Sequence, residues 1–224
     1  MKVYAHRGSS GKYPEMTRTA YEAAIAEGAD GFECDVRLTK DDQIVCIHDR
    51  TTKRIADRNL RVAKNKLKTL QRAYELITLN ELLDLAIGAK KDLLIETKHP
   101  VVSSGRIEQR VQELLALKSD EITSSGIEVI VMSFQRSAVR RISSDWKVCK
   151  VSKYAISSRI SRTKIAALDI ELIVRSPKIV NKLQSKGVRV FAWTVNQRPE
   201  FELCSSLKVD GVITNFPKRA KKYG

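Results

Sequence analysis

The segment Gly31-Phe32-Glu33-Cys34-Asp35-Val36 has the compact, apolar composition of a buried β-strand, yet it carries two carboxylates. Because side chains alternate between the two faces of a strand, Glu33 and Asp35 point the same way and Cys34 points the other way. Two like charges on one face of a core strand repel each other and lose hydration, so they need compensation. A divalent cation is the usual compensation, and the segment therefore predicts a metal site on a core strand. The alternative is an edge strand whose carboxylates face solvent.

Strand-like and helix-like segments alternate along the chain on both sides of this segment, which is the pattern of a parallel α/β fold. Strands are expected at 2–6, 31–38, 43–48, 92–98, 127–134, 147–152, 170–174, 188–196 and 211–214. Helices are expected at 16–27, 78–87, 105–117, 136–142, 176–186 and 199–207, whereas 153–167 shows no clear pattern. About eight strands with intervening helices predict a closed TIM (β/α)8 barrel, with its site at the carboxyl ends of the strands.

The length of 224 residues fits one barrel domain over residues 1–224, without linkers or internal repeats. Residues 49–77 are expected to form a basic, irregular insert, and the Lys- and Arg-rich tail 218–224 is expected to be mobile. No apolar run is long enough for a transmembrane helix, and the first residues lack the apolar core of a signal peptide. We therefore expect the chain in the cytoplasm.

The formal charge of +15 indicates attraction to anions such as phosphoesters, nucleic acid or acidic membrane. The cations are spread along the chain without a zinc-finger, RNP-type or basic-helix dimer signature, which favours a solvated basic surface over a nucleic-acid interface. The four cysteines, Cys34, Cys46, Cys149 and Cys204, form no CxxC or Cys/His cluster, so neither a disulfide framework nor structural zinc is indicated.

Polar side chains gather at the predicted carboxyl ends of the strands. Glu33, Asp35 and Glu96 offer the hard oxygen ligands that Mg²⁺ or Ca²⁺ prefers. His6 and His48 have an unperturbed pKa close to neutrality, which suits them to general acid and base catalysis.

Two cations accompany these residues. Arg7 and Lys98 can hold a phosphoryl group, Arg7 in bidentate fashion, although Lys98 and Glu96 could instead form only an ion pair inside the barrel. Phosphodiester hydrolysis needs charge neutralisation at phosphorus, a group that activates the attacking oxygen and a group that protonates the leaving alkoxide. A metal, two cations and two histidines meet those needs.

The sequence also resembles the glycerophosphodiester phosphodiesterase family. The matching motifs follow the family's order and are His6-Arg7-Gly8, Pro14-Glu15-Met16-Thr17, residues 28–36, His48-Asp49, Ile95-Glu96-Thr97-Lys98, residues 192–196 and residues 210–217. Each motif is weak alone, but the ordered set is specific and spans nearly the whole chain.

The resemblance implies a TIM barrel with a divalent metal, Mg²⁺ or Ca²⁺, held by Glu33, Asp35 and Glu96. It implies that His6 and His48 form the catalytic acid/base pair, and we favour His48 as the base and His6 as the acid. The attacking oxygen would come from water or from the vicinal glycerol hydroxyl.

The resemblance further implies that Arg7 and Lys98 contact the phosphate and that Trp193 walls the substrate pocket, although core packing is an alternative for Trp193. The chain departs from the family at Met16, where asparagine is usual, and at Asn215, where aspartate is usual. These departures bear on substrate preference and rate. The role of Glu15 stays open between supporting the site, binding substrate and starting a helix.

The expected activity is metal-dependent hydrolysis of glycerophosphodiesters to an alcohol and sn-glycerol 3-phosphate, a reaction of lipid and glycerol metabolism. The alternatives are a related phosphodiesterase acting on lysophospholipid head groups and a non-catalytic anion-binding barrel. We expect a small-molecule substrate, no nucleic acid and no stable membrane insertion. The head group, the metal used in the cell and the oligomeric state stay open.

Overall fold

A closed barrel of eight parallel strands forms the centre of the protein, whose computed structural model describes residues 1–99, 105–154 and 163–223. The strands are β1 (Lys2–His6), β2 (Gly31–Leu38), β4 (Asp92–Thr97), β5 (Val129–Ser133), β6 (Lys147–Ser152), β7 (Ile165–Asp169), β8 (Arg189–Trp193) and β9 (Gly211–Thr214). The barrel closes because β1 pairs with β2 on one side and with β9 on the other. The predicted TIM barrel is therefore confirmed.

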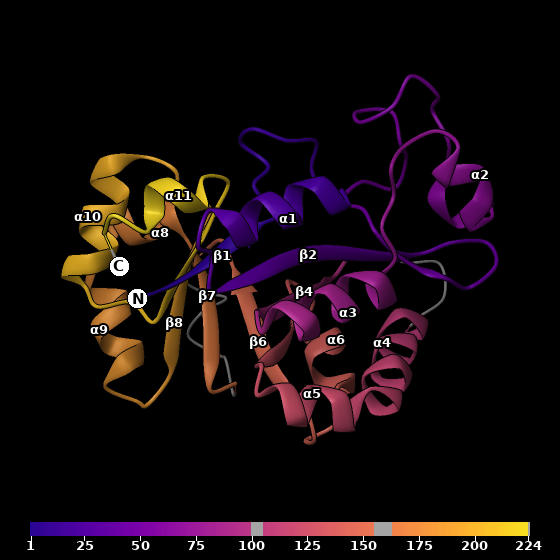
Figure 1. Ribbon diagram of the computed structural model, residues 1–224. Coiled ribbons are helices and arrows are strands. Elements are labelled where there is room, and N and C mark those ends of the chain that lie inside the picture. The colour runs from indigo at the N-terminus through magenta and orange to yellow at the C-terminus, as the bar shows by residue number, and fades with distance from the viewer. Residues whose placement is uncertain (100–104, 155–162, 224) are drawn as a thin grey trace.

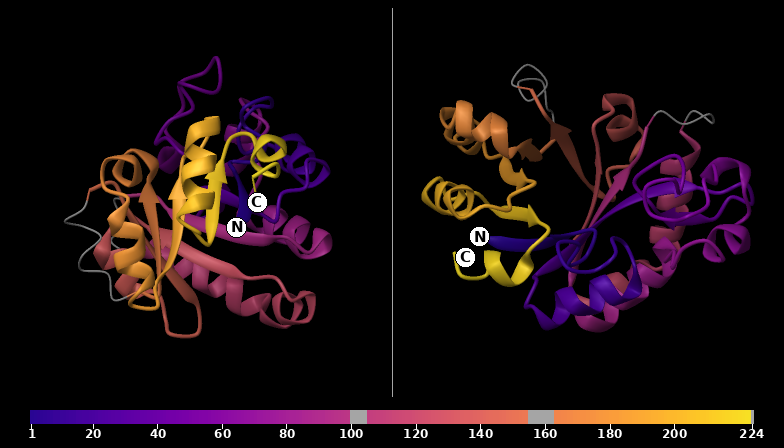
Figure 2. Two further views of the ribbon diagram at one scale, coloured as in Figure 1. Left: turned by 90° about the vertical axis from the view of Figure 1, so that its left-hand side faces the viewer. Right: turned by 90° about the horizontal axis from the view of Figure 1, so that it is seen from above.

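Helices surround the strands, as Figures 1 and 2 show. They are α1 (Arg18–Ala26), α3 (Leu79–Ala89), α4 (Arg106–Leu117), α5 (Ser119–Ser125), α6 (Arg136–Arg141), α8 (Ile170–Arg175), α9 (Lys178–Gln184), α10 (Arg198–Ser206) and α11 (Pro217–Ala220). Thr78 caps α3 in a capping box with Glu81, which satisfies backbone donors that the first helical turn leaves free. No helix in the described part of the chain is both long and apolar enough to cross a membrane.

Strand β2 shows how the alternation of side chains builds two layers. Phe32, Cys34 and Val36 pack in the apolar layer between strands and helices, while Glu33 and Asp35 point into the barrel. Gly31 begins the strand where a Cβ atom would lie 2.8 Å from the ring of Tyr4, so only glycine fits beside that ring. All four cysteines are free thiols and buried.

Residues 49–77, predicted as an irregular insert, contain two short helical elements and follow strand β3 (Ile44–Cys46). Strand β3 runs antiparallel along β2, and the following residues form η1 (Val62–Lys64) and α2 (Leu67–Gln71). They enclose a small apolar cluster of their own, made by Val45, Ile47, Val62, Leu70 and Leu76. Figure 1 shows this segment extending from the rim of the barrel.

One strand was predicted in the wrong place. Residues 170–174, predicted as a strand, form helix α8. The strand is β7, which begins in the preceding stretch 153–167 that showed no clear pattern. Residues 155–162 of that stretch lie outside the described residues. The apolar run continues through both elements, so periodicity alone does not separate a buried strand from a buried helix. Asp169 marks the boundary between β7 and α8, because its carboxylate accepts a hydrogen bond from the Glu171 backbone N–H and caps α8.

The C-terminal tail, predicted as mobile, makes specific contacts up to Tyr223, the last described residue. Residues 217–220 form α11, Lys221 pairs with Asp30 at 3.1 Å, and the Tyr223 ring stacks on Phe201 at 5.4 Å between centroids. The tail thereby lies against the first strand, and both termini sit side by side in every view (Figures 1 and 2).

Candidate active site

Three buried carboxylates meet inside the barrel at the carboxyl ends of β2 and β4. Asp35 lies opposite Glu96 in the strand register, and Glu33 precedes Asp35 by two residues on the same face. One oxygen from each residue lies within 4.8 Å of the others, and the most exposed of the three, Glu96, is only 7% accessible. Such a set of hard oxygen donors can hold a divalent cation.

The charges in this cluster are only partly compensated. Burial, followed by the neighbouring Asp35 carboxylate, raises the pKa of Glu33 well above its usual range and the pKa of Glu96 to about 7. Burial also acts to raise the pKa of Asp35, but Arg7 and Lys98 outweigh it and hold that pKa below its ordinary value. The three carboxylates thus have only two neighbouring cations, Arg7 and Lys98, to balance their charge.

Asp35 receives both cations. Lys98 Nζ lies 3.2 Å from Asp35 Oδ1 and 2.7 Å from Glu96 Oε1, and Arg7 Nε lies 2.9 Å from Asp35 Oδ2. The Arg7 contact is an ion pair by distance, but neither atom makes a well-aligned hydrogen bond within the described residues. A buried carboxylate oxygen without such a partner is the local feature that fits a further cation.

His6 is held at the end of β1 by an amide. Its Nδ1 lies 2.6 Å from Asn215 Oδ1, and its Nε2 lies 3.9 Å from Glu33 Oε2. An amide oxygen only accepts hydrogen bonds, so Nδ1 carries the proton and Nε2 keeps its lone pair. Burial, followed by the charge of Arg7, lowers the pKa of His6 to about 4. The ring is therefore neutral near pH 7.

His48 is held by a carboxylate instead. Its Nδ1 lies 2.7 Å from Asp49 Oδ1, and Arg54 of the insert donates to the other oxygen of Asp49 at 2.7 Å. Burial lowers the pKa of His48, and Asp35 and Asp49 oppose that effect. Arg54 also pairs with both oxygens of Glu15, at 2.7 and 2.8 Å. Since Glu15 lies 3.4 Å from Arg7, Arg54 links the two histidine-bearing sides of the site.

Sequence reasoning missed Arg54, and it left Glu15 unassigned. Arg54 is one of many cations in the basic insert, and its two carboxylate partners come together only in the fold. Nothing in its sequence neighbourhood singles it out.

Two aromatic rings stand beside Lys98. Trp193, at the end of β8, donates through Nε1 to the Ala167 carbonyl at 3.2 Å and meets Phe134 edge to face, with centroids 5.2 Å apart. Lys98 Nζ lies 5.8 Å from the Phe134 centroid. Trp193 therefore packs against the core, and through Phe134 it lies close to Lys98; its role as a wall of the substrate pocket stays a prediction. Phe134 was predicted only as a strand residue.

The two departures from the family pattern have different consequences. Met16 is 1% exposed and packs into the apolar layer, in a left-handed backbone conformation (φ 55°) that asparagine tolerates better than methionine. Asn215 is the direct partner of His6. Only the second departure changes the electrostatics of a candidate catalytic group.

Comparison with known proteins places the chain among phosphodiesterases. The sequence model of the glycerophosphoryl diester phosphodiesterase family matches residues 6–219. A probable glycerophosphodiester phosphodiesterase 1 of Mycobacterium tuberculosis is 30% identical over 250 residues, covering 99% of this chain and 91% of that protein. A glycerophosphodiester phosphodiesterase of Caldanaerobacter subterraneus is 31% identical, covering 96% and 94%.

Solved structures share the fold. The glycerophosphodiester phosphodiesterase of Thermotoga maritima superimposes with a TM-score of 0.82 at 23% identity, covering 99% of this chain and 97% of that one. A phosphodiesterase of Oleispira antarctica, solved with its product sn-glycerol-3-phosphate, gives a TM-score of 0.84 at 20% identity, covering 100% and 96%.

Proposed function

The chain belongs to the glycerophosphoryl diester phosphodiesterase family, and on that basis we propose that it hydrolyses glycerophosphodiesters to an alcohol and sn-glycerol 3-phosphate. One observation carries the proposal: three buried carboxylates stand beside two histidines, each fixed through its Nδ1 atom. The relative from Oleispira antarctica, which was solved with sn-glycerol-3-phosphate, supports the identity of the product.

Glu33, Asp35 and Glu96 would hold a divalent metal, Mg²⁺ or Ca²⁺. When bound, such a metal neutralises charge on the phosphate and makes phosphorus more electrophilic. The raised pKa values of Glu33 and Glu96 and the poorly satisfied Asp35 oxygen support this assignment. Burying a cluster of like charges without a further cation would be costly.

Arg7 and Lys98 lie beside the carboxylates and would orient the phosphate oxygens, Arg7 through its planar fork and Lys98 as a point charge. Trp193 and Phe134 would form the apolar wall of the substrate pocket. Together these side chains fix the diester so that its phosphorus faces both histidines.

We assign His6 as the general base and His48 as the general acid, the reverse of the order favoured from the sequence. His6 is neutral, with its Nε2 lone pair free to take a proton from the attacking water or glycerol hydroxyl. His48 has the carboxylate of Asp49 to stabilise its imidazolium form, which suits it to protonate the leaving alkoxide. The difference lies in the partner of each Nδ1: a neutral amide in one case and an anion in the other.

The test is release of sn-glycerol 3-phosphate from glycerophosphocholine and glycerophosphoethanolamine, with a lysophospholipid in the same panel. EDTA should abolish release, and Mg²⁺ or Ca²⁺ should restore it. His48→Ala should lose activity and recover part of it with substrates whose alcohol is a good leaving group, because such alcohols need no acid. Full activity in EDTA would refute the metal-dependent mechanism, and faster turnover of the lysolipid would favour the alternative substrate class.

A further inference from the structure

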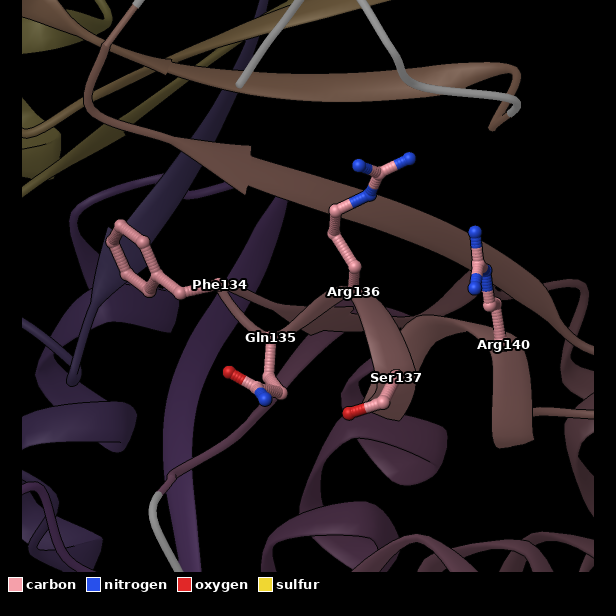
Figure 3. Close-up of a pocket in the computed structure, with 5 residues that line it drawn as sticks. All are labelled: Phe134, Gln135, Arg136, Ser137 and Arg140. Carbon is pink, nitrogen blue, oxygen red and sulfur yellow. The ribbon is translucent and has the colours of Figure 1, made fainter. Parts of the chain in front are cut away.

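A cavity of about 480 Å³ opens at the carboxyl end of β5, and of its lining residues only Phe134 has a role in the mechanism above. It is lined by Phe134, Gln135, Arg136, Ser137 and Arg140, which Figure 3 shows as sticks. It is an open pocket rather than an enclosed one, and its volume lies in the range of small-molecule sites. An apolar ring and two guanidinium groups together suit a small organic anion.

One side chain borders both the cavity and the candidate active site. Phe134 lines the cavity, and its ring also contacts Trp193 and lies near Lys98. Lys98 in turn contacts Asp35 and Glu96. A diester whose phosphorus lies at Lys98 would therefore extend one of its two alcohols past Phe134 into the cavity.

The two arginines lie on one face of α6, four residues apart. Figure 3 shows both side chains extending the same way from the helix. Within residues 1–99, 105–154 and 163–223, neither guanidinium has a carboxylate partner. Arg189 and Arg198, in contrast, pair with Glu128 and Glu202 at 2.7 and 2.8 Å.

A third cation adds to the positive field of this wall. Lys150, on the neighbouring strand β6, is 6% exposed, and its ammonium donates to the Val151 carbonyl. The positive charge of Arg136 is close enough to act on it. The negative charge of Glu96 also acts on Lys150, so the two guanidinium groups that line the cavity are the cations on which its preference for an anion rests.

We propose that this cavity holds the leaving alcohol of the substrate, and that Arg136 and Arg140 select head groups carrying a carboxylate or a phosphate. This inference rests on the proposed function and extends it to a substrate class. Guanidinium groups bind both anions through paired N–H donors. Phe134 covers the carbon atoms that join the anion to the scissile phosphate.

The experiment uses substrates that differ by one anion. Glycerophosphoserine is glycerophosphoethanolamine with an added carboxylate, and glycerophosphoinositol 4-phosphate is glycerophosphoinositol with an added phosphate. We expect kcat/KM of the wild-type protein to be about tenfold higher for the more anionic member of at least one pair. In the double variant Arg136→Gln/Arg140→Gln this ratio should fall towards one.

Lys186→Gln is the matched control. It removes one positive charge from an exposed site before β8, at the opposite end of the barrel, and it should leave the ratio in place. A ratio of one for both pairs in the wild-type protein, or a ratio that survives in the double variant, would overturn the proposal. Because each ratio compares two substrates of one variant, a general loss of activity does not mimic the expected result.

A binding measurement separates this inference from the proposed function. If no diester is hydrolysed in Mg²⁺ or Ca²⁺, the proposed function fails, and titration calorimetry with O-phosphoserine and phosphoethanolamine tests the cavity alone. Tighter binding of O-phosphoserine that is lost in the double variant would support the cavity. Equal binding of the two ligands would refute it.

Discussion

The two ends of the barrel use buried carboxylates in opposite ways. At the amino ends of the strands, Glu128 is paired with Arg189 and Lys147 at 2.6 to 2.9 Å, and Asp92 accepts hydrogen bonds from Lys2 and from the Glu128 backbone. Despite partial burial, Arg189 and Lys147 lower the pKa of Glu128 to about 2. At the carboxyl ends, the pKa of Glu96 rises to about 7.

The difference indicates that the carboxylates at the amino ends of the strands stabilise the fold, whereas those at the carboxyl ends suit the binding of a cation. Carboxylates at the amino ends have protein cations as partners, so their charged form favours the folded state. At the carboxyl ends, burial and the neighbouring Asp35 raise the pKa values of Glu33 and Glu96, so the charged form of these two favours the folded state only when a further cation joins them. This division matches the separation of stability and function between the two faces of TIM barrels.

The largest expected effect is on turnover. Glu96→Gln keeps the shape of the side chain but removes one of the three proposed anionic ligands, and we expect kcat/KM to fall by about 10³-fold. An assay of sn-glycerol 3-phosphate release from glycerophosphoethanolamine measures it, and circular dichroism checks that the barrel still folds. Activity within a few-fold of wild type would show that the carboxyl end does not bind a catalytic cation.

The same variant should gain stability when metal is chelated. A carboxyl with a folded pKa near 7 and an unfolded pKa near 4.5 contributes stability below pH 4.5 that is lost as pH rises through 7. In EDTA, the stability of Glu96→Gln relative to wild type should therefore rise by about 3 kcal/mol between pH 4.5 and pH 8. Urea titrations of both proteins measure the difference, in which the titration of groups that do not interact with Glu96 cancels; the pKa of Glu33 should fall in the variant and add to the gain. A constant difference across this range would contradict the raised pKa.

Glu128→Gln should have the opposite signature. It removes a charged partner of Arg189 and Lys147, and we expect a loss of about 1.5 kcal/mol in the free energy of unfolding, reduced by the exposure of Lys147. A depressed pKa gives stability that is present above pH 4.5 and lost as pH falls towards 2. The loss should therefore shrink in acid, while kcat/KM stays unchanged. A fall in kcat/KM without a fall in stability would break the division between the two ends.

The smallest effect concerns the link between the insert and the site. Arg54→Gln should lower kcat/KM by about fivefold, because Glu15 and Asp49 lose the guanidinium that positions them. With less compensation of Asp49, the pKa of His48 should rise, so the pH–rate profile should move to higher pH. Arg72→Gln removes an exposed cation from the same insert and serves as the control. A pH–rate profile that does not shift in Arg54→Gln would show that Arg54 has only a structural role.

Much of the fold follows from local pattern. The boundaries of β1, β2, β6 and β9 and the capping box at Thr78 agree with the prediction, because alternation and capping are read within a few residues. The exchange of strand and helix around Asp169 and the packed tail were missed. Both depend on which neighbours cover an apolar or basic segment, and a local pattern carries no such information.

For the site, the chain alone indicated that Glu33 and Asp35 share one face of a strand, and it indicated which residues stand at strand ends. That much follows from a two-residue period and from the rule that parallel strands meet at one edge. Only the tertiary structure brought Asn215 to His6 and Arg54 to Glu15, across 209 and 39 positions of sequence. The first contact fixes the proton of His6 on Nδ1, and Arg54 also pairs with Asp49, the partner of His48. Neither arrangement can be read from the sequence, because electrostatic interactions depend on distance in space and not on distance along the chain.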